Sequence, residues 1–146
     1  PLVAECRVAL AGEIAAMSLE QDFALAAIDW LAGDAALMAQ VNGVFHRAPA
    51  RIAVPYALLD DVLATDWGTK DRPGRELRLA FSIRDGSQDA GPVSAIAAAL
   101  ETRLMAMPPS GSGYRLVSLH PLRSRTVRIG ETWLVTLDYR ARLLAP

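Results

Sequence analysis

The segment from Arg75 to Arg84 alternates between apolar and mostly polar side chains. Successive side chains of a β-strand point to opposite faces, so this pattern predicts a strand with one buried face and one exposed face. A strand of this kind needs other elements to cover its apolar side, so the chain must build a sheet with a covered face. The inward positions are Leu77, Leu79, Phe81 and Ile83, and the outward ones are Glu76, Arg78, Ser82 and Arg84.

Three further segments have the composition of strands. Residues 56–64 are apolar on both faces apart from two aspartates. Residues 114–129 form a long strand-like stretch that is interrupted at Pro121. Gly130–Glu131 predicts a turn into a last strand, 132–142, which alternates again.

Two longer segments carry apolar residues at helical spacing. Ser18, with Gln21 three residues later, predicts the start of the first helix, and Gly33 predicts its end as a C′ residue. Asp34 is expected to cap a short helix that follows. The second main helix runs from Pro92 to the proline pair 108–109. The order of elements predicts an α+β fold, with a mainly antiparallel sheet and two main helices packed on one face.

The chain has 146 residues, which predicts a single domain. The regular pattern opens at Met17–Ser18, so we assign this domain to residues 17–146 and interpret residues 1–16 as an N-terminal extension. No apolar run reaches the length of a membrane span, so no membrane partner is expected.

Charge is unevenly distributed along the chain. Residues 1–73 carry 10 acidic and 5 basic side chains, and residues 74–146 carry 6 and 10, which gives a net charge of −1. One interpretation is a set of unrelated solvated faces. The other is a subunit with opposite charge on two surfaces, as a head-to-tail ring would use.

The sequence contains no motif for catalysis or for binding a metal or cofactor. His46 and His120 lack ligand spacing, and the only cysteine, Cys6, has no partner of a known signature. Asp60 and Asp61 are adjacent in a predicted strand, so they are expected to point to opposite faces and cannot share a proton. We therefore expect no enzyme activity, no metal and no cofactor.

Two features are candidates for contacts. The bend 66–74 is longer than a tight turn and carries a tryptophan among charged residues. The second feature is an arginine cluster on the last hairpin, in which Arg123, Arg125 and Arg128 are expected to face Arg140 and Arg142. The cluster is either a solvated hairpin face or a charged face of a ring or channel, and it lacks the aromatic residues that would stack on bases.

The order of short motifs resembles the tail-completion family of long-tailed phages and gene transfer agents, which includes tail terminators. The resemblance covers roughly Ser18 to Leu144, and its most specific matches are Pro55–Tyr56, Trp67 to Lys70, and Trp133. The motifs are LAAIDWLAGDAAL, VFHRAPARIAVPYALLDD, DWGTK, AIAAALETRL, YRLVSLHPLRSRTVR and TWLVTLDYRARL.

This resemblance implies a structural protein of the virion, made in the bacterial cytoplasm and located at the head–tail junction. Such proteins form a homo-hexameric ring that caps the head-proximal end of the tail tube, stops its polymerisation and offers a docking surface to the head. The implied partners are further copies of the chain, the tail tube protein, and a head-completion protein (a stopper or connector). DNA would pass through the lumen without sequence-specific binding.

The resemblance also gives roles to the two candidate features. The bend becomes a contact with a neighbouring subunit or with the tail tube, in which Trp67 is the anchor and Thr69, Lys70, Asp71 and Arg72 make polar contacts. The alternative is that Trp67 folds back on its own sheet. The arginine cluster becomes a charged face of the ring or of its lumen.

Two rival classes remain open at this point. One is a small ligand-binding or enzymatic α+β domain that uses Asp60, Asp61 and His46. The other is a nucleic-acid-binding module that uses the arginines near the C-terminus.

Overall fold

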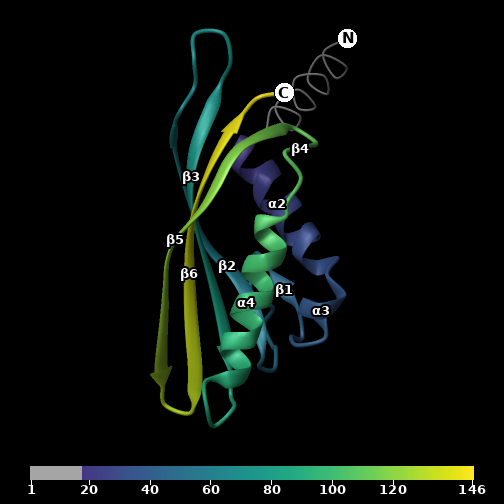
Figure 1. Cartoon of the computed structure of the whole chain (residues 1–146), viewed down its shortest axis with the longest axis vertical. Helices are drawn as coiled ribbons and strands as arrows, with labels where there is room; N and C mark the ends of the chain where they lie inside the picture. Colours follow the sequence, from purple (N-terminus) through teal and green to yellow (C-terminus); the bar gives the residue numbers. More distant parts are fainter. Residues whose placement is uncertain (1–17) are drawn as a thin grey trace, which may run out of the picture.

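A computed structural model of the chain describes residues 18–146. In this range a six-stranded sheet runs in the order β1-β2-β3-β6-β5-β4, and the helices lie on one side of it (Figure 1). Only the pair β1–β2 is parallel. The predicted α+β fold is confirmed, whereas the predicted extension 1–16 and Cys6 lie outside the described residues. The elements are α2 (Leu19–Ala32), α3 (Ala35–Met38), β1 (Val44–Phe45), β2 (Tyr56–Asp66), β3 (Gly74–Asp85), α4 (Gly91–Met105), β4 (Ser110–Gly111), β5 (Tyr114–Ile129) and β6 (Thr132–Leu144).

The starts of α2 and α3 follow from side-chain caps. The Ser18 hydroxyl accepts a hydrogen bond from the Gln21 N–H at 3.2 Å, and the Asp34 carboxylate accepts one from the Leu37 N–H at 3.3 Å. Each cap satisfies a backbone donor that the first helical turn leaves without a partner. Gly33 does end α2, but it is the C-cap residue, with a right-handed φ of −79°, and not the C′ residue that was predicted.

The alternating strands place their apolar side chains under the helices. All four predicted inward residues of β3 are buried, as are Val135, Leu137, Tyr139 and Ala141 of β6. These strands lie at the centre of the sheet, so the helical stripes of α2 and α4 complete a core between one sheet face and the helices. Ser82 was expected on the exposed face but is only 4% exposed.

Trp30 links α2 to α4 through contacts with Arg103. Its indole N–H donates to the Arg103 carbonyl at 2.7 Å, and Arg103 Nε donates back to the Trp30 carbonyl at 2.8 Å. The Arg103 guanidinium also stacks 3.4 Å from the centre of the indole ring. Trp30 packs against the core and is partly buried.

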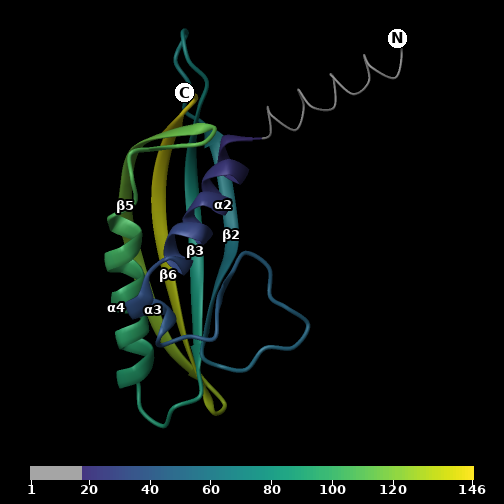
Figure 2. The ribbon, with the colours of Figure 1, turned by 90° about the vertical axis from the view of Figure 1, so that its right-hand side faces the viewer.

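Two strands have long stretches with a single strand neighbour within residues 18–146. β1 pairs with β2 only at Ala57 and Leu58, so Asp60–Asp66 is bordered by β3 alone. β4 pairs only with the first two residues of β5, so Val117–Ile129 is bordered by β6 alone. The loop between β2 and β3 projects beyond the end of the sheet, as both views show (Figures 1 and 2).

Candidate functional site

The projecting loop, residues 67–73, is held by its own hydrogen bonds. The Thr69 N–H donates to the Arg72 carbonyl at 2.9 Å, and the Arg72 N–H donates to the Thr69 hydroxyl at 3.2 Å. At the base of the loop, the Trp67 N–H donates to the Gly74 carbonyl at 3.1 Å. Together these bonds give the loop a defined shape rather than leaving it an open link between strands.

Trp67 lies at the base of this loop and is partly buried within its own chain. The Arg142 guanidinium of β6 lies 5.4 Å from the centre of the Trp67 ring, within the range of a cation–π contact. Part of the ring is therefore packed on its own sheet, and part stays accessible. The loop residues Thr69, Lys70 and Asp71 are exposed, and Arg72 is half-buried.

The arginines of the last hairpin do not face one another as expected. Strand register places Arg123 opposite Asp138 and Arg128 opposite Trp133, while Arg140 lies opposite His120. The expected arrangement was wrong because the two-residue turn fixes the register and puts Arg140 and Arg142 at the far end of the hairpin from Arg125 and Arg128. In the described sheet, two arginines lie opposite each other only where Arg78 of β3 pairs with Arg140 of β6.

Arg128 also lies on the other side of the sheet from the rest of the cluster. It pairs with Trp133, which belongs to the face that the helices cover, and its guanidinium lies 5.1 Å from the Trp133 ring centre. Its guanidinium also donates to the Gln88 carbonyl at 2.9 Å. The other four arginines lie on the opposite face, which we call the helix-free face.

Acidic side chains neutralise much of the charge on the helix-free face. The Glu76 carboxylate lies 3.1 Å from Arg142 Nε and 3.8 Å from Arg140 Nε. Arg123 donates to Asp138 at 2.5 Å. Among the described residues, Arg125 is the member of this group that has no ion pair. The face is therefore a mixed-charge surface rather than a continuous cationic patch.

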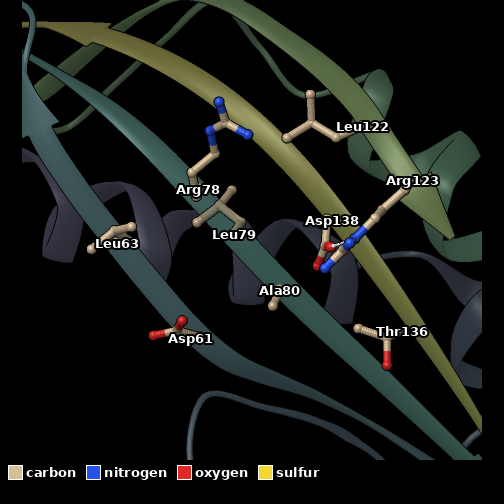
Figure 3. A pocket seen from close by; sticks show the side chains of 9 residues that line it. All are labelled: Asp61, Leu63, Arg78, Leu79, Ala80, Leu122, Arg123, Thr136 and Asp138. Atoms are coloured by element: carbon tan, nitrogen blue, oxygen red, sulfur yellow. Dashed lines mark hydrogen bonds and ion pairs between the residues drawn. The ribbon is translucent and has the colours of Figure 1, made fainter. Parts of the chain in front are cut away.

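A hollow of about 600 Å³ lies on the helix-free face. Figure 3 shows Asp61 and Leu63 of β2 along one side and Leu122 and Arg123 of β5 along the other. Ala80 of β3 and the β6 residues between them form the floor. The hollow spans the full width of the four long strands, so its two walls belong to the two outermost of them.

The aspartates of the rival enzymatic hypothesis lie at a bulge in β2. Leu59 pairs with Phe81 and Asp61 pairs with Ala80, so Asp60 is an additional residue without a partner in β3. The bulge interrupts the regular alternation from which opposite orientations were expected. Within residues 18–146, His46 makes no hydrogen bond or ion pair with these aspartates, and its Nδ1 lies 3.5 Å from the Leu59 carbonyl oxygen.

Tyr139 of β6 and Glu101 of α4 form a titratable pair that stabilises the fold. Burial is the main cause that raises the pKa of Tyr139, and the neighbouring Glu101 carboxylate raises it further. The Tyr139 hydroxyl donates to that carboxylate at 3.4 Å and so links β6 to α4. Within residues 18–146 no group of three or more His, Cys, Asp or Glu side chains is placed to hold a metal ion, and no helix is long and apolar enough to cross a membrane.

Two comparisons with known proteins agree with each other. Residues 26–144 match a family model described as tail completion protein gp17. A chain of a solved structure described as "Virion of native gene transfer agent (GTA) particle" superposes with a TM-score of 0.78 and is 25% identical in sequence. That match covers 89% of this chain and 100% of the other chain. No curated protein sequence matches.

Proposed function

The chain belongs to the family of the tail completion protein gp17, and on this premise we propose that it forms the ring that terminates a phage-type tail. Family membership and the likeness to a virion chain make it a structural protein of such a tail. Our proposal adds a closed ring of six copies at the head–tail junction of the particle. This ring stops polymerisation of the tube and offers the head its docking surface, and the chain acts without catalysis.

One observation carries this proposal. The family model matches residues 26–144, and the structural match includes the whole of a chain that is itself part of a gene transfer agent particle. The fold also suits repeated assembly. Within residues 18–146, β2 and β5 each have a second strand neighbour over only two residues, so the remaining stretches offer contact surfaces on both sides of the sheet.

The projecting loop is the proposed axial contact. It extends beyond the sheet along the strand direction, so in a ring whose axis follows the strands it would reach toward the adjoining tube or the next subunit (Figure 1). Trp67 supplies the accessible part of its ring as the anchor. The loop residues Thr69, Lys70, Asp71 and Arg72 supply polar contacts around it.

The helix-free face is the proposed lining of the ring, because the helices cover the other face. Arg123, Arg125, Arg140 and Arg142 would then face the lumen, and Arg128 would not. DNA would pass along this lining without sequence-specific binding, since three of these four arginines are engaged by Glu76 or Asp138. Engaged cations release fewer counterions from phosphates, which keeps the attraction weak.

Electron microscopy of particles made without this protein tests the proposal. We expect filled heads and tails that are not joined, and tails of abnormal length. Re-expression of the chain restores joined tails of normal length. Joined tails of normal length in its absence would refute the terminator function.

A further inference from the structure

Within residues 18–146, the two outermost long strands of the sheet present backbone edges that are free over most of their length and carry opposite charge. β2 carries Asp60, Asp61 and Asp66 and no lysine or arginine. The stretch of β5 without a second neighbour, Val117–Ile129, carries Arg123, Arg125 and Arg128 and no aspartate or glutamate. An edge strand offers unpaired N–H and C=O groups to a further strand, and opposite charges on two such edges favour their pairing.

Strand directions allow the two edges to meet in different copies. Each neighbouring pair from β2 through β3 and β6 to β5 is antiparallel, so β2 and β5 of one chain run in opposite directions. A second copy related by rotation about an axis along the strands would bring its β2 beside this β5. The new pair would be antiparallel, and the sheet would continue from copy to copy.

Register places the opposite charges at the same level of the sheet. Asp61 pairs with Ala80, Ala80 pairs with Asp138, and Asp138 pairs with Arg123. Asp61 and Arg123 therefore lie at the two ends of one row of paired residues across the four strands. Both line the hollow of the helix-free face (Figure 3). Arg125 lies on the same face, two residues further along β5.

Exposed apolar side chains accompany these charges. Leu63 of β2 is 58% exposed and Leu122 of β5 is 40% exposed. Both lie within two residues of the Asp61–Arg123 row, on opposite edges. One contact between copies would cover both, which explains why each edge carries an apolar residue beside its charges.

We propose that the free edge of β5 in one copy pairs antiparallel with the free edge of β2 in the next copy, with Asp61 set against Arg123 and Arg125. This inference rests on the ring-forming part of the proposed function and names the surfaces that make the ring. The contact is heterologous: each copy uses its acidic edge on one side and its basic edge on the other.

Charge reversal with complementation tests this contact. The variants Asp61→Arg and Arg125→Asp each place like charges across every contact, so each should raise the protein concentration needed for half-assembly by about tenfold or more. The double variant restores opposite charges and should assemble like the wild type. An equimolar mixture of the two single variants should also assemble, because alternating copies make only matched contacts.

Sedimentation velocity measures assembly, and circular dichroism confirms that each variant is folded. Asp29→Arg, on the exposed side of α2, is the matched control and should assemble normally. Normal assembly of both single variants, or no recovery in the mixture, would overturn the edge contact while leaving the ring intact. A wild-type chain that stays monomeric, both alone and in the particle, would overturn the ring itself and the edge contact with it.

Discussion

Replacement of Trp67 by alanine tests whether this residue is an interface anchor or a core residue. In the monomer the change removes a cation–π contact with Arg142, at 5.4 Å, which contributes about 0.5–1 kcal/mol at an exposed site. Complete loss of a buried tryptophan costs about 3–5 kcal/mol, and Trp67 is only partly buried at the end of the sheet. We therefore expect a loss of about 1–2 kcal/mol in the free energy of unfolding, or a fall in Tm of about 4–8 °C.

The effect on assembly should be larger. Truncation of an interface anchor costs about 2 kcal/mol or more at each contact, which corresponds to a roughly thirtyfold weaker association. Thermal melting by circular dichroism measures the first effect, and sedimentation velocity across a concentration series measures the second. Assembly onto tail tubes provides a third readout if the anchor contacts the tube.

Trp30→Ala is the matched control, because Trp30 is a second tryptophan that packs against the core and joins α2 to α4 through Arg103. It loses the 2.7 Å hydrogen bond to the Arg103 carbonyl and the stacked guanidinium at 3.4 Å, so the monomer itself should be destabilised by about 3–5 kcal/mol. If Trp67→Ala destabilises the monomer as much as Trp30→Ala and leaves association unchanged, Trp67 belongs to the core and its role as an anchor is refuted.

Three further predictions concern the fold. Glu76→Gln removes the ion pairs with Arg140 and Arg142, so it should lower the free energy of unfolding in urea by about 1–2 kcal/mol. The control Glu131→Gln, in the exposed turn, should leave it almost unchanged. Equal unfolding midpoints for the two variants would contradict the role of Glu76. Gly74→Ala places a Cβ 2.8 Å from the Leu143 carbonyl oxygen and should cost about 1–3 kcal/mol. Gly86→Ala should cost less, because its Cβ meets only one Val54 methyl, at 3.3 Å. The pKa of Tyr139 is raised above its ordinary 10.0, so the folded state holds the proton more tightly than the unfolded state, and stability falls as pH rises above that value. The free energy of unfolding of Tyr139→Phe should therefore fall less than that of the wild type between about pH 9 and about pH 11, as measured by urea unfolding. Equal falls in the two proteins would disprove this.

The regular parts of the fold follow from local rules in the sequence. Alternation identified the buried side chains of β3, and the caps at Ser18 and Asp34 identified two helix starts. These features depend on neighbouring residues alone, because the side-chain period and the cap hydrogen bonds are set within a few positions. The position of the bulge at Asp60 depends on how β2 pairs with β3, so no local sequence pattern predicted it.

The arginine cluster was misplaced although the sequence held a usable signal. A two-residue turn at Gly130–Glu131 pairs Ile129 with Thr132 and, counting back, sets Arg123 opposite Asp138. The same count gives Arg128 the opposite face from Arg125. The contact between Trp67 and Arg142 was not predictable in this way, because it joins a loop to a strand 75 positions later and depends on the pairing of β3 with β6.

A reconstruction of the head–tail junction in the intact particle tests the proposed ring. We expect one closed ring of six copies between the head and the tail tube, with the helix-free face toward the lumen and the helices outside. Copies found along the tube, at the distal tip or inside the head would contradict it.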